Sequence, residues 1–500
     1  MKTKRNFYFS NIINPQKMKK QLIYIICLLT LRAWGQSPYI HKVYEYMPAP
    51  GQFVNELPEY EEGDTKNDMR LKAEECIADN EQILVSLGGY GGYIVFGFDH
   101  MVENKPGKYD FKIMANAFYA AANPNGEASR EGGSCEPGIV MVSYDANGNG
   151  KPDDEWYELA GSEYFKSETI KKYRLTYYKP DENKVRTPDN NYPYLNDTTY
   201  IHWKSNQETQ GYLYRNTFHN QSYFPLWVDA DSLVFEGTKL ANNYVDESGT
   251  GTYYVQYAYH WGYVDNHPNA DDRSNFNIEW AVDQNGNPVQ LPGIHFIKVY
   301  TAVNQYCGWL GETSTEIMGA VDLHVRGQDI SVPVFTQRIG LDYTDINLKP
   351  DETALLTATV VPANATNTQI TWKSKDIGIA TVNNGYVTAI AEGTTVISAI
   401  TNDGYYIAKC NVTVENVSGA ESVYKPFRKA AYEGNSLYLT GFENMTCELY
   451  SINGYKLADF QCFSDHEEFR INLSQGVFIL KIKNQIHNHS IKVNVLKNKL

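Results

Sequence analysis

Short runs of alternating polar and apolar residues, separated by turn residues, fill residues 336–415 and limit what this part of the chain can fold into. The runs are "ALLTATVVP", "QITWKS", "ATVNNGYVTAI", "TVISAIT" and "AKCNVTV". Successive side chains of a strand point to opposite faces, so a period of two predicts half-buried strands. Several short strands with regular turns are typical of a two-sheet sandwich, and we expect an immunoglobulin-like one here.

One stretch of this segment resembles a known family. "ITWKSKDIGIATVNNGYVTAIAEGTTVISAIT" is similar to the bacterial Ig-like domain of group 2, which has a Trp-Lys/Ser strand followed by I-A-T-V, G-x-V-T-A and G-T-T-x-I steps. Gly385 and Gly393 occupy its two turn positions, where a positive φ is easily accommodated. Trp372 is expected in the core. The resemblance implies a spacer or an adhesive module and does not choose between them.

The last part of the chain, residues 436–500, predicts a small β-sandwich. Its "ELYSINGYKL" and "INLSQGVFILKI" resemble the C-terminal sorting domain of proteins exported by the type IX secretion system. The resemblance implies an address tag without a catalytic role, and a plain β-domain is the alternative. The polar, unpatterned segment 416–435 predicts a linker.

The first 35 residues have the features of an export signal. The basic "KMKK" (17–20) precedes the apolar run "LIYIICLLTL", and the small residues of "AWG" precede Gln36. Met18 is an alternative start. The apolar run is too short to span a membrane, and no other segment predicts a transmembrane helix. We therefore expect a protein that is secreted or attached to the outer cell surface.

Composition narrows the function classes further. The net charge of −15 argues against a nucleic-acid partner, whose phosphates require a basic stripe. Thirty-nine tyrosines and 37 glycines favour strands joined by many turns. Six cysteines follow the export signal without a C-x-x-C pair, so we expect no zinc site. Cys447 and Cys462 fit either a disulfide between two strands or buried free thiols.

Residues 37–333 predict an elaborated jelly-roll sandwich. In "VSLGGYGGYIVFGFDH" (85–100) the glycines precede a strand, whereas a phosphate loop follows a strand and opens a helix, so tight turns explain them better. The strand order resembles jelly-roll sandwiches of secreted bacterial surface proteins, several of which bind carbohydrate. With "PAPGQFVN" (48–55) and "FIKVYTAVNQ" the chain also resembles uncharacterised cell-surface proteins that neighbour outer-membrane nutrient importers, including cobalamin importers. The resemblance implies a glycan or another nutrient such as cobalamin as ligand, and an outer-membrane importer as partner.

An aromatic-rich insertion, residues 162–290, interrupts this domain. In "TYYVQYAYHWGYVDNHPNADD" alternate aromatic residues fall on one face of a predicted strand. Such a face is either core or a platform on which a ligand stacks. The ligand-binding candidates are Tyr257, Tyr259, Trp261 and Tyr263. The nearby His260, Asp265, His267 and Asp271 fit either a metal site or a turn whose polar groups satisfy one another.

The acidic stretch "SYDANGNGKPDDEWYELAG" (143–161) predicts a calcium site. Asp145, Asn147 and Asn149 take positions 1, 3 and 5 of a calcium loop and Gly150 takes position 6, but position 12 is Trp156 instead of a glutamate. The carbonyl of residue 151 and one of the following carboxylates can complete the shell, and a solvated polar turn is the alternative. The predicted ligands are Asp145, Asn147, Asn149, Lys151, Asp153 and Asp154, with calcium as a structural cofactor.

The same stretch contains the candidate catalytic pair. Glu155 and Glu158 fit the acid and base of glycoside hydrolysis, which requires two carboxyl groups about 5–10 Å apart. The chain contains neither G-x-S-x-G nor H-E-x-x-H. We therefore expect an all-β, non-catalytic binding protein. A calcium-dependent glycoside hydrolase and a structural adhesin that binds a protein partner are the alternatives.

Overall fold

The structure is a computed structural model that describes residues 35–120, 130–415 and 429–495, the last range without residues 434, 441, 443–444, 452–454, 465 and 484–487. The predicted export signal and most of the predicted linker lie outside the described residues. The chain divides into two compact units, residues 1–415 and 416–500. Among the described residues no helix is long and apolar enough to cross a membrane.

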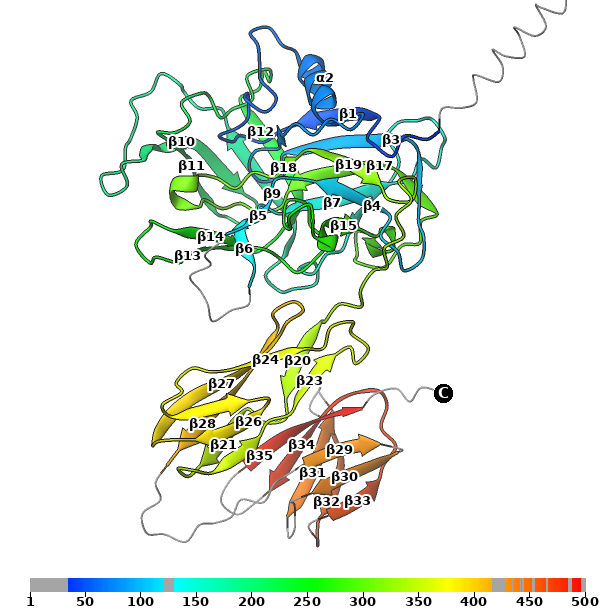
Figure 1. Ribbon diagram of the computed structural model, residues 1–500, viewed down its shortest axis with the longest axis vertical. Coiled ribbons are helices and arrows are strands. Elements are labelled where there is room, and N and C mark those ends of the chain that lie inside the picture. Colours follow the sequence, from blue (N-terminus) through cyan, green and yellow to red (C-terminus); the bar gives the residue numbers. More distant parts are fainter. Residues whose placement is uncertain are drawn as a thin grey trace, which may run out of the picture. The chain divides into compact units, whose positions relative to one another are not determined.

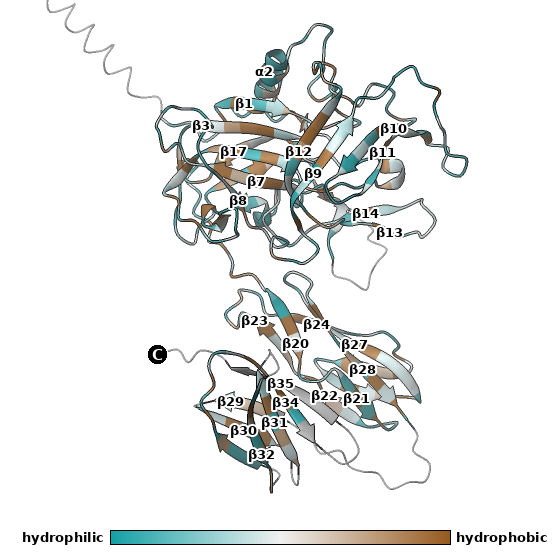
Figure 2. Ribbon diagram, turned by 180° about the vertical axis from the view of Figure 1, so that it is seen from behind, coloured by the Kyte–Doolittle hydropathy of each residue, from teal (hydrophilic) through white to brown (hydrophobic). Residues whose placement is uncertain are grey.

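A six-stranded antiparallel sheet organises the N-terminal part of the first unit (Figure 1). Its strands lie in the order β1 (Lys42–Met47), β3 (Tyr93–Glu103), β17 (Gly293–Thr301), β7 (Gly138–Ser143), β8 (Trp156–Leu159) and β16 (Ala281–Val282). The central strands are buried on both faces, and hydrophobic stretches run along β3 in Figure 2. Both faces are covered, which explains why these strands read as nearly continuous apolar runs.

Helix α2 (Lys66–Ile77) packs against the main core. Its Met69, Ala73 and Ile77 are buried in the same cluster as Ile94 and Phe96 of β3. A capping box starts the helix, because Thr65 accepts from the backbone N–H of residue 68 and the Asp68 carboxylate accepts from the N–H of residue 65. No helix was expected here from the sequence.

Smaller sheets complete this part of the chain. The insertion builds a sheet of its own from β11 (Gln210–Asn216), β10 (Leu195–Ser205), β9 (Ile170–Tyr178) and β12 (Ser232–Lys239). After β12 the chain returns to the parent sheets. A second four-stranded sheet has the order β13 (Tyr244–Asp246), β14 (Tyr254–Tyr257), β6 (Gly132–Ser134), β5 (Phe118–Tyr119). A three-stranded sheet has the order β15 (Asn275–Phe276), β4 (Phe111–Met114), β19 (Gly319–Asp322). The two short strands β18 (Glu316–Ile317) and β2 (Val85–Ser86) pair with each other. Three 3-10 turns are η1 (Asp272–Ser274), η2 (Ile278–Trp280) and η3 (Gly308–Leu310).

The glycine cluster before β3 forms tight turns. Gly88 and Gly91 have φ angles of 66° and 84°, which L-residues with a side chain rarely adopt. A Cβ at Gly88 would lie 1.9 Å from the carbonyl oxygen of Ala49, and one at Gly91 would lie 2.3 Å from Cβ of Phe235. The glycines therefore let backbone segments approach closely ahead of a strand, which confirms the tight-turn interpretation.

The C-terminal part of the first unit has the predicted alternation of short strands. Its sheets are β20 (Arg338–Leu341) with β23 (Ala358–Val361); β21 (Asp345–Leu348), β28 (Ile407–Val414), β27 (Gly393–Thr401) and β24 (Ile370–Ser374); and β22 (Thr353–Leu355), β26 (Tyr386–Ala389) and β25 (Ala380–Asn383). Trp372 packs against the core of this sandwich. Gly385 has a φ of 85° in the turn between β25 and β26, as its place in the motif predicts.

The second unit is again built from strands. Three strands, β29 (Lys429–Glu433), β30 (Ser436–Thr440) and β33 (His466–Arg470), form one sheet, and β32 (Lys456–Gln461), β31 (Thr446–Ser451), β34 (Gly476–Lys483) and β35 (Asn488–Val495) form the other. Cys447 and Cys462 are both buried and are not joined in a disulfide. The all-β class is confirmed, whereas the jelly-roll and sorting-domain assignments stay predictions.

Candidate functional site

The acidic stretch forms the loop between the paired strands β7 and β8. Asp145 accepts from the backbone N–H groups of Asn149 and Gly150 at 3.1 and 2.8 Å, and Asn147 accepts from the N–H of Asn149 at 3.0 Å. Gly148 and Gly150 have φ angles of 71° and 68°, which lets the loop turn sharply. The loop thereby folds around the alternate side chains that the calcium pattern singled out.

Asp153 closes the loop from its far end. Its carboxylate accepts from Nδ2 of Asn147 at 3.1 Å and from Nδ2 of Asn149 at 3.0 Å. These hydrogen bonds hold the pKa of Asp153 below its usual range. Position 9 of the loop thus supplies the closing carboxylate that position 12 lacks.

The donor set of this loop fits calcium. Calcium takes six to eight oxygen ligands, and this loop contains the carboxylates of Asp145 and Asp153 and the amide oxygens of Asn147 and Asn149. Oδ2 of Asp154 is buried and has no hydrogen-bond partner among the described residues, although a buried carboxylate oxygen is costly to leave unpaired. The ion would join the ends of β7 and β8, held by Asp145, Asn147, Asn149, Asp153, Asp154 and the carbonyl oxygen of Lys151.

A second loop has a similar start but no closing carboxylate. In residues 283–288 Asp283 accepts from the backbone N–H groups of Asn285 and Asn287 at 2.8 and 2.9 Å. The sequence D-Q-N-G-N-P continues without an acidic residue. This loop is therefore a matched example of the polar-turn alternative.

The predicted ligand-binding aromatic residues are not an exposed platform. Tyr257, Tyr259 and Tyr263 are 1%, 8% and 2% exposed, and Trp261 is half-buried, stacked on Phe335 with ring centroids 4.9 Å apart. Strand β14 ends at Tyr257, so these residues do not share one strand face. The prediction of a stacking role is wrong for Tyr257, Tyr259 and Tyr263, because their rings are buried.

The neighbouring histidines contact partners of their own, although Nδ1 of His260 is buried without a hydrogen-bond partner among the described residues. His267 lies 2.6 Å from the Tyr119 hydroxyl through Nδ1 and 2.9 Å from the carbonyl oxygen of residue 260 through Nε2. Burial lowers the pKa of His267 to about 3. Asp271 pairs with Arg273, and His260 pairs with Asp403. The residues predicted as a metal cluster thus bind separate partners, except for Asp265.

Glu155 and Glu158 do not form a catalytic pair. Glu155 is exposed just before β8 and accepts from the Tyr157 hydroxyl at 2.9 Å. Glu158 is largely buried within β8, accepts from Thr238 at 2.6 Å and lies 3.6 Å from Lys171. Residues three apart on extended chain point to opposite faces, so the two carboxylates do not face one substrate. Burial raises the pKa of Glu158 and lowers that of Lys171 to about 8.

Sequence reasoning missed a buried carboxylate cluster. Glu136, Asp265 and Glu316 come from distant segments, and their carboxylate oxygens lie within 4.8 Å of one another. Asp265 accepts from the backbone N–H of Glu316 at 2.9 Å, and Glu316 accepts from the Ser86 hydroxyl at 3.1 Å. Burial and then mutual repulsion raise the pKa of Asp265 and of Glu136. Such a cluster needs a bound cation or shared protons to offset its charge.

Without a bound cation, the cluster makes stability depend on pH. Burial raises the pKa of Glu316 from 4.5 to about 7, so the folded chain binds this proton more tightly than the unfolded chain. Its contribution is therefore complete below pH 4.5 and is lost as the pH rises toward 7. In chelator, we expect Glu316→Gln to reduce the fall of the thermal midpoint between pH 5 and pH 8.

Glu392→Gln, which replaces an exposed glutamate, is the control and should leave the pH profile unchanged. A Glu316→Gln profile identical to that of the unchanged chain would refute proton sharing in this cluster.

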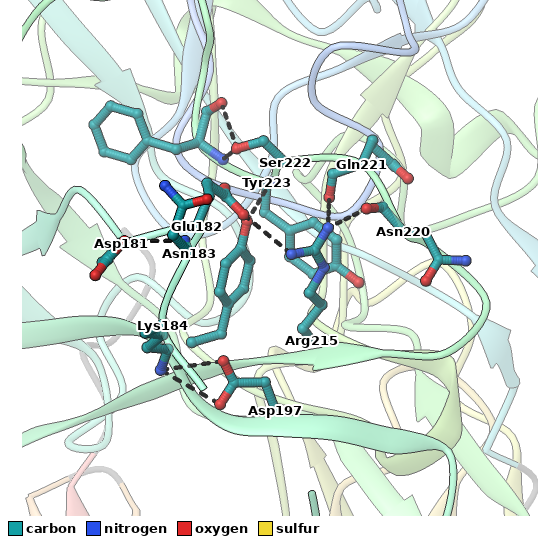
Figure 3. Close-up of polar contacts among 12 residues, drawn as sticks. Asp181, Glu182, Asn183, Lys184, Asp197, Arg215, Asn220, Gln221, Ser222 and Tyr223 are labelled. Carbon is teal, nitrogen blue, oxygen red and sulfur yellow. Dashed lines mark hydrogen bonds and ion pairs between the residues drawn. The ribbon is translucent and has the colours of Figure 1, made fainter. Parts of the chain in front are cut away.

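The insertion also contains a paired polar network that anchors β11 (Figure 3). Arg215 pairs with Glu182 at 3.0 Å and donates to the carbonyl oxygens of Asn220 and Gln221. Glu182 also accepts from the Tyr200 hydroxyl at 2.6 Å. Arg215 is only 6% exposed, and its contacts hold the loop after β11 against the sheet. This network is a structural support, because its charges pair with one another.

Comparison with known proteins supports the Ig-like segment. Residues 335–412 match the family described as Bacterial Ig-like domain (group 2). The chain is 34% identical to an Ig-like virion protein of Serratia phage KSP90 over 146 residues, which is 27% of this chain and 52% of that protein. It is 37% identical to an alpha-L-arabinofuranosidase of Bifidobacterium longum subsp. longum over 93 residues, which is 18% of this chain and 9% of the enzyme. The chain thus spans about half of the first relative and about a tenth of the second.

Similar solved structures include domains 4–9 of the surface layer protein SbsC, at 16% identity and a TM-score of 0.16 over 42% of this chain and 41% of that one. They also include the BSP domain of a biofilm associated protein, at 9% identity and a TM-score of 0.22 over 95% of this chain and 70% of that one. The strands of this segment and the family match over residues 335–412 together define an all-β protein with a bacterial Ig-like domain. The Ig-like prediction for residues 336–415 is confirmed.

Proposed function

We propose that this chain is a non-catalytic binding protein of the cell exterior that captures a glycan and is stabilised by calcium. The folded β7–β8 loop supports the calcium part of the proposal, because hydrogen bonds gather the side chains of Asp145, Asn147, Asn149 and Asp153 within one short loop. Calcium loops of this type suit extracellular modules, where the free ion is abundant. The ion would hold a hairpin of the central sheet and take no part in chemistry.

An exterior location fits several independent features. The sequence begins with a basic and apolar export-type segment, and it ends with the segment that resembles a sorting domain. A relative that is 34% identical over 146 residues is named an Ig-like virion protein. The Ig-like domain would then be a spacer, and an outer-membrane importer remains the proposed recipient of the ligand.

Retention of ligands by the full chain tests this function. The chain is immobilised in calcium buffer and exposed to neutral oligosaccharides, anionic oligosaccharides and cobalamin. Retention of at least one oligosaccharide is expected. Retention of cobalamin alone would mean that the captured nutrient is cobalamin instead of a glycan. Retention of none of these ligands would contradict the nutrient-capture function and favour an adhesin with a protein partner.

A further inference from the structure

Six tyrosines from distant segments gather on one part of the N-terminal region, and none of them was singled out by the sequence. Three ring pairs have centroids 5.0 to 6.2 Å apart. The pairs come from the loop before β10, from β11 with the loop after β17, and from the β13–β14 hairpin. We call this set the tyrosine cluster; its members are Tyr192, Tyr194, Tyr214, Tyr244, Tyr254 and Tyr306.

Further contacts join the three pairs into one surface. The tip of the β13–β14 hairpin lies against two pairs, since a Cβ at Gly251 would be 2.9 Å from the Tyr192 ring and 3.5 Å from the Tyr254 hydroxyl. Burial, then Tyr254 and Tyr192, raise the pKa of Tyr194. Burial and Glu312 raise the pKa of Tyr306, with smaller contributions that include Tyr194. The loop after β17 also lies against the hairpin, since a Cβ at Gly308, two residues after Tyr306, would be 2.1 Å from the Tyr254 ring.

The rings are accessible at the edge of the cluster. Tyr192 is 40% exposed, and the other five tyrosines are partly buried. Trp309, which is 42% exposed, follows Gly308, and a Cβ at Gly308 would lie 2.1 Å from the Tyr254 ring. The hydroxyl of Tyr306 has no hydrogen-bond partner among the described residues. The exposed rings of Tyr192 and Trp309 thus offer flat apolar faces to a ligand.

Each loop that carries the cluster is held by its own hydrogen bonds. Asp189 accepts from the N–H groups of Asn191 and Tyr192 at 2.7 and 3.1 Å. Asp246 accepts from the N–H groups of Ser248 and Gly251 at 3.1 and 2.7 Å. Strand β11 is anchored by the Arg215 network of Figure 3. A preformed aromatic surface loses little conformational entropy when it binds a ligand.

The charges around the cluster select against anions. Among the described residues, the carboxylates of Asp189 and Asp246 act on Tyr194, and that of Asp246 also acts on Tyr254. A negatively charged ligand would be repelled by these groups. Sugar hydroxyl groups can instead donate to carboxylates, while the C–H faces of sugar rings stack on aromatic rings.

We propose that the tyrosine cluster is the binding site for a neutral oligosaccharide. This site rests on the proposed function, to which it adds a location and a class of ligand. The rings stack on the sugar faces, and the surrounding carboxylates and tyrosine hydroxyls bind the sugar hydroxyls. The buried aromatic residues around Tyr257 take no part in binding.

Isothermal titration of the full chain with cello-, xylo- and manno-hexaose and with oligogalacturonate tests the site. We expect binding of a neutral probe, no binding of oligogalacturonate, and a loss of affinity of about ten-fold or more in Tyr192→Ala and in Tyr254→Ala, as for aromatic contacts worth about 1.4 kcal/mol. Tyr386→Ala, which removes a 61% exposed tyrosine from the Ig-like domain, is the matched control and should bind as the unchanged chain does. Unchanged thermal midpoints show that the variants fold.

The outcomes separate the site from the function. If Tyr192→Ala and Tyr254→Ala both still bind the neutral oligosaccharide as the unchanged chain does, the site is overturned and glycan capture stands. Binding of oligogalacturonate alone overturns the neutral ligand class. Absence of binding to every oligosaccharide by the unchanged chain overturns the proposed glycan function, and the site with it.

Discussion

Calcium added to the chelator-stripped chain should raise the midpoint of thermal unfolding of the N-terminal region. A ligand that binds only the native state stabilises it by about 2.7 kcal/mol at a hundred-fold excess over its dissociation constant. Magnesium should have a smaller effect, because it demands octahedral geometry and gives up its water reluctantly. Differential scanning calorimetry with each ion measures both responses.

Asp145→Ala should abolish the calcium response. The substitution removes a ligand and also two hydrogen bonds to Asn149 and Gly150, so the readout is the shift on adding calcium and not the midpoint itself. Asp283→Ala is the matched control, because it removes two equivalent backbone hydrogen bonds, and one from the Asn287 side chain, from a loop without a closing carboxylate. It should lower the midpoint and keep the calcium shift. A calcium shift that survives in Asp145→Ala would exclude the β7–β8 loop as the site.

Gly88→Ala should destabilise the N-terminal region strongly. The left-handed conformation costs a residue with a side chain about 1–2 kcal/mol. The new Cβ would also lie 1.9 Å from the carbonyl oxygen of Ala49 and 2.9 Å from a methyl group of Val54. Overpacking of this kind adds about 1–3 kcal/mol, and the sum of about 2–5 kcal/mol is large relative to the stability of a domain. Thermal or denaturant unfolding measures the loss.

Gly107→Ala separates the two contributions. Gly107 has a φ of 69°, close to the 66° of Gly88, but no atom lies within 4 Å of its Cβ position. Gly107→Ala should therefore lose only the stability that the left-handed conformation costs, about 1–2 kcal/mol. Equal losses in the two variants would mean that the chain at Gly88 relaxes without strain and that the close approach to Ala49 is unimportant.

Local pattern was sufficient where the structure is local. The alternation in residues 336–415 predicted the Ig-like strands, and Gly385 lies in a turn with positive φ as its motif position requires. The acidic loop was predictable for the same reason, since its side chains contact their own loop between residues 145 and 153. Positions a few residues apart determine these features.

The aromatic run shows where a period of two misleads. Alternation continues in sequence from Tyr257 to Tyr263, but the strand ends at Tyr257. Beyond it Asn266 accepts from the N–H of Tyr259 and donates to its carbonyl oxygen, both at 2.7 Å, and so folds the segment into a turn. A polar residue seven positions away ended the strand, and the alternation gave no sign of it.

The carboxylate cluster and the tyrosine cluster could not be predicted, because both depend on tertiary structure. Glu136, Asp265 and Glu316 are separated by more than 50 residues each and have no common motif. The six tyrosines likewise come from distant loops and strands in a chain with 39 tyrosines. Only the sheet order, which brings β17 beside β3 and β7, places such segments together.

Product analysis of the neutral oligosaccharide that the full chain retains tests the central claim most directly. The chain is incubated with the oligosaccharide in calcium buffer, and the sugar is recovered and analysed by mass spectrometry. A non-catalytic binding protein should return the oligosaccharide at its original length. Shortened products that disappear in Glu158→Gln or Glu155→Gln would contradict this account and establish a glycoside hydrolase.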